Sequence, residues 1–303
     1  MAVTVEKLIK DFDLEILVEG EENIKIPVND INRPGLQLAG FYNYFAPERL
    51  QVIGKAEWSF LQDMQPELKR KRIDKFFSFN SNCIVMTRGL EPQEELINAA
   101  RKKKVWLLRT KMVTTNFISR MTIYLADQFA PETRLHGVLI DVYGIGILIT
   151  GESGIGKSEV ALELIKRGHR LVTDDAVDIK EIDGQLIGTS PKITIGMLEV
   201  RGIGIIDISS LYGLSSVLQT KDINLIMHFE HWKDDGDYDR LGIDNESEEI
   251  LGVQVKRLRV PVRPGRNIAV IIEAAAVNYR YSLMSDVTPV DIIEKRMSMM
   301  TES

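Results

Sequence analysis

The chain has 303 residues, of which 44% are hydrophobic and 27% charged, and its formal net charge is −6 at pH 7. This composition is that of an ordinary globular protein, and the length predicts two domains. The acidic balance argues against broad nucleic-acid binding, no apolar run approaches the length of a membrane span, and the first residues do not resemble a secretion signal. We therefore expect a cytoplasmic protein.

The first third of the sequence alternates short apolar runs with amphipathic charged segments. Residues 83–87 (CIVMT) and 105–108 (VWLL) have the composition of buried strands, and residues 92–103 between them have that of a helix. Strand, helix and strand in this order predict a small α/β domain. The single cysteine, Cys83, cannot form an intrachain disulfide, so we interpret it as a buried strand residue.

A run of four cations, KRKR at residues 69–72, can be read as a nucleic-acid patch. Four positive charges in an acidic chain are weak evidence for nucleic-acid binding, so we favour a solvated helix face. Residues 113–129 predict another helix, and the polar stretch APETR that follows predicts a domain boundary. We divide the chain into 1–130, an N-terminal α/β domain with no assigned binding role, and 131–303, a catalytic domain.

The second half of the sequence is rich in β-branched residues and is interrupted by glycines. Residues 138–150 (VLIDVYGIGILIT) predict two strands with a turn or bulge at Gly144 and Gly146, and Asp183-Gly184 predicts the turn of a hairpin. The further elements that we expect are a helix over 157–167 ended by Gly168, a buried strand over 223–229, and a helix from Pro289 onward. The second domain is therefore strand-rich, with helices on its outside.

Residues 151–158 (GESGIGKS) match the pattern G-x-x-x-x-G-K-S of a phosphate-binding loop, between a strand and a helix as that motif requires. The glycines let the backbone bring its N–H groups close to phosphate oxygens, and the helix points its positive end at the same anion. Lys157 would reach the β- and γ-phosphates and Ser158 would ligate Mg²⁺. We assign nucleotide binding to Gly151, Glu152, Ser153, Gly154, Ile155, Gly156, Lys157 and Ser158.

Phosphoryl transfer also needs a metal partner, a group that handles a proton, and positive charge. His136 stands directly before the strand that leads to the loop; its charge can change near neutral pH, although a histidine at a strand start is more often a capping or packing residue. Asp174 and Asp175 end an apolar run, and adjacent carboxylates on a strand point to opposite faces. One could then lie beside the metal while the other is a general base; a pair of turn acids is the alternative.

Two further segments carry charges in unusual places. In residues 196–209 (GMLEVRGIGIIDIS), Glu199 and Arg201 interrupt an apolar run and share a face, and a charged pair inside a buried strand needs a partner or a metal. Residues 261–267 (PVRPGRN) carry two arginines on a loop shaped by proline and glycine, which could clamp an anion. From the residues alone we prefer a solvated turn for this second segment.

These motifs stand in a recognisable order over residues 136–267: His136, GESGIGKSE, TDDAV, LEVRGIGIIDI, YDRLG and PVRPGRN. In this combination the chain resembles the bifunctional HPr kinase/phosphorylase family, and LEVRGIGIIDI is far more specific than the phosphate loop. In the N-terminal half the resemblance rests only on its length and on its alternation of apolar and charged segments. It implies a two-domain α/β fold, with a C-terminal P-loop kinase domain like the nucleotide-binding domain of phosphoenolpyruvate carboxykinase.

The resemblance also implies a reaction. ATP, with pyrophosphate as an alternative donor, would phosphorylate a seryl residue of the phosphocarrier protein HPr, and inorganic phosphate would remove that group and release pyrophosphate. Mg²⁺ or Mn²⁺ would be the metal cofactor. A homohexamer, activation by a sugar phosphate, and control of carbon catabolite repression and sugar uptake are implied as well, with no nucleic-acid or membrane partner.

Roles carry over from the family by position. The implied catalytic residues are His136, Lys157, Asp174, Asp175 and Arg240, and the implied Mg²⁺ ligands are Ser158 and Glu199. Asp175 would accept the seryl proton in the forward direction and return it in the reverse. The family signature covers Leu198, Glu199, Val200, Arg201, Gly202, Ile203, Gly204, Ile205, Ile206 and Asp207. The loop implied in dephosphorylation is Pro261, Val262, Arg263, Pro264, Gly265 and Arg266.

Two other functions stay open at this point. The phosphate loop alone fits a P-loop kinase for a small metabolite, and the unassigned N-terminal half fits a nucleotide-switched binding protein. No N-K-x-D follows the loop, which disfavours a guanine-specific GTPase, and the aspartate pair directly after the first helix is not the layout of a motor or transport ATPase. Neither alternative needs Glu199 and Arg201 in a buried strand, so that segment favours the protein kinase.

Overall fold

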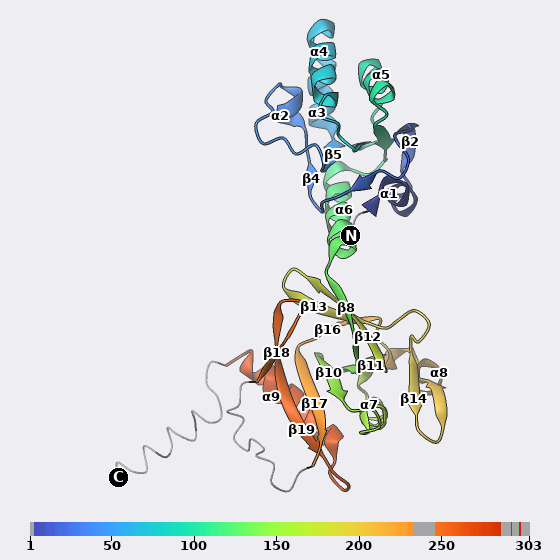
Figure 1. The fold of residues 1–303 in the computed structure, drawn as a ribbon, viewed down its shortest axis with the longest axis vertical. Helices are drawn as coiled ribbons and strands as arrows, with labels where there is room; N and C mark the ends of the chain where they lie inside the picture. Colours follow the sequence, from blue (N-terminus) through green and yellow to red (C-terminus); the bar gives the residue numbers. More distant parts are fainter. Residues whose placement is uncertain (1–2, 233–245, 286–291, 293–296, 298–303) are drawn as a thin grey trace. The chain divides into compact units, whose positions relative to one another are not determined.

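The computed structural model describes residues 3–232, 246–285, 292 and 297. Contacts divide the chain into two compact units, Met1–Ala130 and Pro131–Ser303. Each unit has its own sheets (Figure 1) and its own hydrophobic cores. Among the described residues, no helix is both long and apolar enough to cross a lipid bilayer.

The first unit is built on a five-stranded sheet in the order β2-β7-β6-β5-β4. Strands β4 to β7 run parallel, and β2 pairs antiparallel with β7. The strands of this unit are β1 (Val3–Thr4), β2 (Glu15–Val18), β3 (Lys25–Ile26), β4 (Ile31–Asn32), β5 (Leu50–Ile53), β6 (Cys83–Met86) and β7 (Trp106–Arg109). Its helices are α1 (Val5–Phe12), α2 (Gly35–Leu38), α3 (Lys55–Gln62), α4 (Pro66–Phe77), α5 (Glu94–Lys103) and α6 (Thr114–Phe129).

The small α/β domain predicted from the sequence is confirmed in this unit. The two predicted strands are β6 and β7, and the two predicted helices are α5 and α6. Helix α5 begins at Glu94 because the backbone of Gln93 is extended, with φ −66° and ψ 149°. Glutamates in its first turn and lysines in its last suit the helix dipole.

Side-chain alternation along β6 places two cores on opposite faces of the sheet. Cys83 and Val85 point into the core that α1 and α6 cover, so the prediction of a buried Cys83 is confirmed. Ile84 and Met86 point into the core that α4 and α5 cover. Burial of each such side chain contributes about 1.5–3 kcal/mol, which is why α4 and α5 are held to the sheet despite their charged outer faces.

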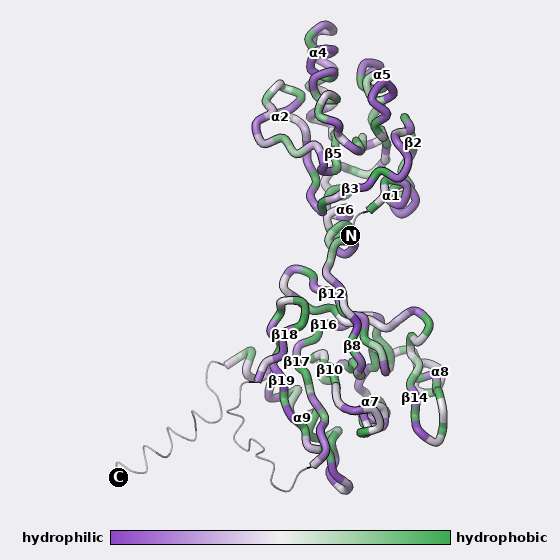
Figure 2. Tube along the Cα trace, viewed as in Figure 1, coloured by the Kyte–Doolittle hydropathy of each residue, from purple (hydrophilic) through white to green (hydrophobic). Residues whose placement is uncertain are grey.

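The cationic run at residues 69–72 lies on α4, which Figure 2 shows as a largely hydrophilic helix. Arg70 and Lys71 are exposed, whereas Lys69 and Arg72 are half-buried. The guanidinium of Arg72 packs on Gly40, where an added Cβ would meet it. The predicted solvated face is therefore confirmed for the two middle cations only.

In the second unit a six-stranded sheet, β11-β9-β10-β17-β19-β18, lies between helices α7 and α9 on one face and a four-stranded sheet, β16-β13-β12-β8, on the other. Strands β14 and β15 form a separate two-stranded sheet. The strands are β8 (Glu132–His136), β9 (Val138–Val142), β10 (Ile145–Gly151), β11 (Arg170–Thr173), β12 (Ala176–Ile182), β13 (Gln185–Thr189), β14 (Met197–Val200), β15 (Gly204–Asp207), β16 (Thr220–Asp222), β17 (Leu225–His231), β18 (Ser247–Ile250) and β19 (Val253–Val262). The helices are α7 (Lys157–Lys166), α8 (Ile208–Tyr212), the 3₁₀ turn η1 (Leu214–Ser216) and α9 (Ile268–Ser282).

Strands β10, β17 and β19 run parallel through the centre of the larger sheet. On one face Ile147 and Ile149 of β10 pack in the core formed with α7 and α9. On the other face Leu148 packs in the core shared with the four-stranded sheet. Because β10 is buried on both faces, its sequence is a continuous apolar run rather than an alternating one.

Both predicted turns are confirmed. Tyr143 and Gly144 connect β9 to β10 with φ of 52° and 88°, and Asp183 and Gly184 connect β12 to β13 with φ of 51° and 80°. Two successive positive φ values are the requirement of a type I′ hairpin, which matches the right-handed twist of the strands. The predicted helix after the phosphate loop is α7, and Gly168 (φ 94°) follows its last turn.

Two details of the sequence reading are corrected. His136 is the last residue of β8 rather than the residue that begins a strand, and residues 132–134 of APETR belong to β8 because they pair with β12. The predicted helix from Pro289 onward lies outside the described residues, apart from residues 292 and 297.

Candidate active site

The phosphate loop joins the end of β10 to the start of α7, as the motif requires. Gly151, Gly154 and Gly156 have φ of 140°, 86° and 103°, values that side-chain-bearing residues rarely adopt. At Gly151 an added Cβ would lie 2.6 Å from the carbonyl oxygen of Phe229 on β17. The loop conformation therefore depends on glycine at these positions, and it ends where the first N–H groups of α7 lack intrahelical partners.

Lys157 and Ser158 are the first two residues of α7. The Lys157 ammonium donates hydrogen bonds to the carbonyl oxygens of Gly151 and Glu152, both at 2.9 Å, so the side chain folds back over the loop. The Ser158 hydroxyl donates to the carboxylate of Asp174, at 3.0 and 3.1 Å from its two oxygens. The cation and the hydroxyl of the motif are thus both held at the loop.

The two adjacent aspartates point in different directions, as predicted, but they lie in the turn between β11 and β12 rather than on a strand. Asp174 is 7% exposed and also accepts a hydrogen bond from the backbone N–H of Glu199. Burial raises the pKa of Asp174, and the hydrogen bonds from Glu199 and Ser158 oppose that rise. The backbone of Asp175 is left-handed, with φ 68°, which turns its side chain outward.

The outward carboxylate of Asp175 lies beside His136. The distance from His136 Nδ1 to Asp175 Oδ1 is 3.7 Å, and both side chains are more than four-fifths exposed. The backbone N–H of Gly137 donates to the Asp175 carbonyl at 3.0 Å, which ties the end of β8 to the aspartate turn. An exposed carboxylate with a neighbouring imidazole can exchange a proton with a group that arrives from solvent.

The expectation of a charged pair in a buried strand is wrong for Glu199 and Arg201. Leu198 and Val200 of β14 point into the core beside α7, so the alternate residues, Glu199 and Arg201, face outward and are exposed. The shared face was predicted correctly. The misreading arose because β14 belongs to a two-stranded hairpin with β15 and is covered on one side only.

Arg201 lies against the phosphate loop. An added Cβ on Gly154 would be 2.6 Å from its Nη2 and 2.7 Å from its Nη1, so the guanidinium covers the loop at that glycine. The described residues provide no acid that forms an ion pair with Arg201, whereas Arg134, Arg167 and Arg170 of the same unit each have one.

A cavity of about 130 Å³ collects these groups. Its walls are Ser153, Gly154, Gly156, Lys157, Ser158, Glu159, Asp174, Asp175, Glu199 and Arg201. The phosphate loop, the aspartate pair and the signature strand, which the sequence separates by up to 48 residues (201 minus 153), thus meet at one site. Glu159, which the loop pattern alone does not explain, lines the same cavity.

Of the predicted arginine loop, Pro261 and Val262 are the last two residues of β19, and residues 263–266 follow that strand. They lie at the same edge of the sheet as the phosphate loop, because β10, β17 and β19 are parallel. The Arg263 guanidinium lies 4.6 Å from the ring centroid of Trp232, and Arg266 donates to the carbonyl oxygen of Pro261 at 2.9 Å. Neither arginine is among the residues that line the cavity. Arg240 and the YDRLG stretch lie outside the described residues.

Sequence reasoning missed three residues in the second half of β17 and directly after it. His228 Nδ1 lies 2.9 Å from the hydroxyl of Thr150, His231 Nε2 lies 3.7 Å from the Glu152 carboxylate, and Trp232 contacts Arg263. Burial lowers the pKa of His228. Ligands of open α/β sheets bind at the carboxyl ends of the strands, so this end of the predicted strand was itself the available indication.

The fold and the site define a P-loop phosphotransferase. Comparison with known proteins then gives the family. The family model of the HPr serine kinase N terminus matches residues 3–125, and that of the HPr serine kinase C-terminal domain matches residues 127–297.

A protein of Clostridium perfringens (strain SM101 / Type A) named HPr kinase/phosphorylase is 75% identical over 98% of this chain and 97% of its own length. A protein of the same name from Clostridium botulinum (strain Alaska E43 / Type E3) is also 75% identical, over 100% of this chain and 99% of its own. A solved structure of the Hpr(Ser) kinase/phosphatase from Coxiella burnetii has 36% identity and a TM-score of 0.47, covering 50% of this chain and 93% of that one.

The chain belongs to the HPr kinase/phosphorylase family, and it is an enzyme of that bifunctional kinase/phosphorylase class. The family resemblance and the two-domain α/β fold inferred from the sequence are thereby confirmed. A kinase of this kind takes a nucleotide substrate and works with a divalent metal ion.

Proposed function

We propose that the enzyme transfers the γ-phosphoryl group of ATP to a seryl hydroxyl of HPr and removes that group again by phosphorolysis. In the first direction the seryl O–H bond breaks, ADP leaves, and a proton is released to a base. In the second, inorganic phosphate attacks the phosphoserine, the serine oxygen takes up a proton, and pyrophosphate forms. The names of the relatives support the substrate, and the cavity at the phosphate loop supports the chemistry.

The observation that carries this proposal is the different exposure of the two adjacent aspartates, one buried and one open to solvent. Asp174 is buried and bound to the loop serine, so its carboxylate lies beside the position that we propose for the metal and is shielded from an incoming protein. Asp175 is exposed and lies beside His136, where a seryl side chain of another protein can reach it. We therefore assign the general base, and in the reverse direction the general acid, to Asp175, with His136 as its neighbour.

The remaining cavity residues fit a nucleotide with a bound divalent ion. Lys157 would move from the carbonyl oxygens that now hold it to the β- and γ-phosphates. Mg²⁺ typically binds to one or two protein carboxylates or hydroxyls and takes its other ligands from phosphates and water. The Ser158 hydroxyl, the adjacent Asp174 carboxylate and the nearby Glu199 offer that donor set. The ion would neutralise charge on the transferring phosphoryl group.

No group of three His, Cys, Asp or Glu side chains in the described part of the chain is arranged to hold a metal ion alone. The metal site that we propose is therefore one that the nucleotide completes. Mn²⁺ would fit the same oxygen ligands.

We propose that the positive charge of Arg201 stabilises the negative charge of the phosphoryl group in the transition state. Its guanidinium lies against Gly154 without an acidic partner among the described residues, so its charge is available to a phosphoryl group at the loop. The same charge would serve both directions, because both pass through a similarly loose transition state. Arg240 and the loop at residues 261–266 would act with it, the loop chiefly by binding inorganic phosphate for phosphorolysis.

On the basis of the family membership we propose several wider properties. They are a division into an N-terminal α/β domain at 1–130 and a catalytic domain at 131–303, a homohexamer, activation by a sugar phosphate, pyrophosphate as an alternative donor, a cytoplasmic location, and control of carbon catabolite repression and sugar uptake. The direction of the reaction would then follow the concentrations of ATP and inorganic phosphate.

Intact-mass spectrometry tests the reaction directly. Purified HPr is incubated with this enzyme, ATP and Mg²⁺, and inorganic phosphate is then added. We expect HPr to gain the mass of one phosphoryl group on a serine and to lose it again as pyrophosphate appears. An HPr mass that stays unchanged while ATP phosphorylates a small metabolite would contradict the proposal.

A further inference from the structure

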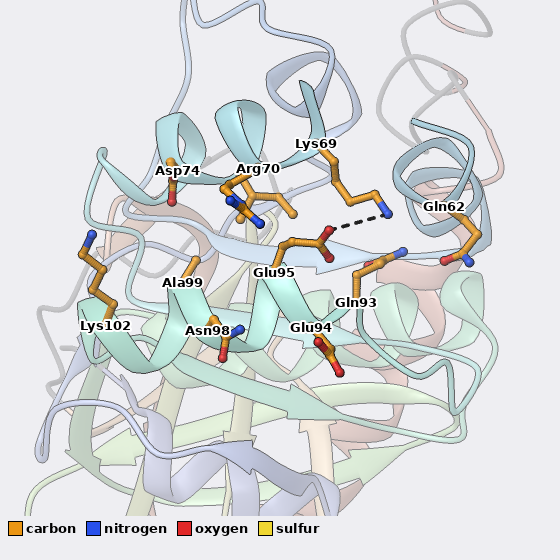
Figure 3. A pocket seen from close by; sticks show the side chains of 11 residues that line it. Gln62, Lys69, Arg70, Asp74, Gln93, Glu94, Glu95, Asn98, Ala99 and Lys102 are labelled. Atoms are coloured by element: carbon orange, nitrogen blue, oxygen red, sulfur yellow. Dashed lines mark ion pairs between the residues drawn. The ribbon is translucent and has the colours of Figure 1, made fainter. Parts of the chain in front are cut away.

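The first unit contains a cavity of about 670 Å³ between α3, α4 and α5, for which the kinase reaction has no use. Its volume is in the range of small-molecule binding sites. Figure 3 shows its lining, which is polar almost throughout; Ile73 and Ala99 are the apolar side chains in it. The walls come from three helices of one compact unit, so the cavity does not depend on any other part of the chain.

Two side chains in this lining lack the partners that buried polar groups normally have. Gln93 is 8% exposed; its Nε2 donates to the carbonyl oxygen of Trp58, but its Oε1 has no hydrogen-bond partner among the described residues. The Lys69 side chain is 12% exposed, and its ammonium lies 3.9 Å from Glu95, too far for a hydrogen bond. Such groups carry a desolvation cost that a ligand bringing a donor and an acceptor would offset.

The charges of the lining are balanced. The three cations are Lys69, Arg70 and Lys102, and the three acids are Asp74, Glu94 and Glu95. A polyanion such as a nucleotide would need an excess of cations, and an apolar ligand would need an apolar wall. Three amides, those of Gln62, Gln93 and Asn98, add both donors and acceptors to the same surface.

This mixture of balanced charges and amides matches a ligand that carries several hydroxyl groups. A hydroxyl group donates one hydrogen bond and accepts others at the same oxygen, so each hydroxyl is satisfied by an acceptor and a donor placed side by side. Lys69 and Glu95 form such a pair, and Figure 3 shows Gln93 beside them. A hydroxyl between the ammonium and the carboxylate would hydrogen-bond both, and a second one could donate to Gln93.

We propose that this cavity is a binding site for a small hydroxyl-rich ligand, a sugar or polyol, recognised through its hydroxyl groups. Hydroxyl groups occur on free sugars and on their phosphates alike. The balanced charge places recognition on the hydroxyls, so a phosphate should add little to the affinity. The site lies in the unit that carries no part of the phosphate-loop cavity, so its occupancy can be measured whether or not the kinase reaction is as proposed.

Ligand-observed saturation-transfer NMR on the full chain tests this site, with D-glucose, D-fructose and mannitol as probes and the two hexose monophosphates as a second arm. We expect transfer to at least one unphosphorylated probe, with a Kd within about threefold of that of its monophosphate. Lys69→Met and Gln93→Leu should each raise that Kd about tenfold or more, since each removes a hydrogen bond from a shielded site.

Lys71→Met is the matched control, because Lys71 is an exposed lysine on the same helix and does not line the cavity. It should leave the Kd unchanged, and circular dichroism melts of the three variants exclude unfolding as the cause of lost binding. Binding of the monophosphates alone, binding that survives both cavity substitutions, or no transfer to any probe would each overturn the proposal.

Discussion

The two cavities of this enzyme are built in opposite ways. The phosphate-loop cavity is small and is shaped by backbone: three glycines with positive φ, a helix N-terminus and a carboxylate fixed by hydrogen bonds. The cavity between α3, α4 and α5 is several times larger and is shaped by side chains on regular helices, with a single long ion pair across it. A site built from backbone favours glycine where φ is positive, so it leaves a local pattern in the sequence. A site built from side chains on regular helices leaves no such pattern.

The largest effect is expected from Asp175→Asn, which tests the chemistry of the backbone-built cavity. Without a base, phosphorylation of HPr and its phosphorolysis should both slow by up to about 10⁴-fold. Nucleotide affinity should stay within a few-fold, because the exposed Asp175 carboxylate is not bonded to the loop. Rates of both directions and equilibrium nucleotide binding are the measurements. Full activity of this variant would remove Asp175 from its assigned role.

A smaller loss is expected from Arg201→Gln, which removes the guanidinium above Gly154 that has no acidic partner among the described residues. Loss of one charge-stabilising donor should reduce kcat about 10²–10³-fold while the Kd for ADP changes little. Arg134→Gln is the matched control, since Arg134 is an exposed arginine of the same unit that pairs with Asp178 away from the cavity lining. If ADP binding falls as far as kcat, Arg201 only supports the loop.

Comparison of Gly154→Ala with Gly168→Ala separates the effect of backbone strain from the effect of contact with Arg201. Gly154 lies in the phosphate loop, and Gly168 follows α7. Both glycines have positive φ, 86° and 94°, so each alanine should cost about 1 kcal/mol of stability. Only at Gly154 would the new Cβ meet Arg201; at Gly168 nothing lies within 4 Å. We expect kcat to fall about tenfold or more for the first variant and to be unchanged for the second. Equal kinetics of the two variants would show that Arg201 is free to move aside.

In the side-chain-built cavity, Lys69→Met should leave both catalytic rates within about twofold when no sugar is present. Replacement of one half-buried ion-pair member changes the free energy of unfolding by about 1 kcal/mol or less, because the Lys69–Glu95 contact is long and partly solvated. Steady-state kinetics and chemical denaturation measure the two quantities. A large loss of activity would mean that the two cavities are energetically coupled.

The smallest effect concerns Asp207, which caps α8 at the end of the signature segment. Hydrogen bonds from the side chains of Ser209 and Ser210 lower its pKa from 3.8 to about 2. Because the folded-state pKa is depressed, the associated stability is present above pH 3.8 and is lost as the pH falls toward 2. Ser210→Ala should raise the pKa measured by carboxyl NMR without changing the kinetics at neutral pH. A pKa that stays near 2 in this variant would contradict the assigned cause.

The same contrast explains what the sequence could predict. Glycine spacing, paired turn residues and continuous apolar runs follow local physical rules, so β6, β10, α7 and the turns at Gly144 and at Asp183-Gly184 were predicted correctly. The burial of β14 was predicted wrongly because a strand covered on one side and one covered on both have similar composition over a few residues. Glu199 and Arg201 could be placed only once the pairing of β14 with β15 was known.

The helical cavity was beyond prediction for a different reason. Lys69 lies in a charge run that was read as a solvated face, and Gln93 is the second residue of the helix predicted over 92–103 and directly precedes the observed α5. Their burial comes from the packing of α4 against α5 on one face of the sheet, which brings together residues 24 positions apart (93 minus 69). Local sequence rules contain no information on such a contact. The end of β17, in contrast, could have been found from the parallel topology alone.

Strand β8 has a consequence for insertions and deletions in this family. It begins two residues after the end of the first unit and ends at His136, which is paired in register with Ala176, next to Asp175. Because strand side chains alternate, a change of one residue between Glu132 and His136 would either shift that pairing or move His136 to the opposite face. The part of the junction that forms β8 therefore cannot vary in length as an ordinary linker does, and exchange of the N-terminal unit between relatives has to keep the count of residues from Glu132 to His136.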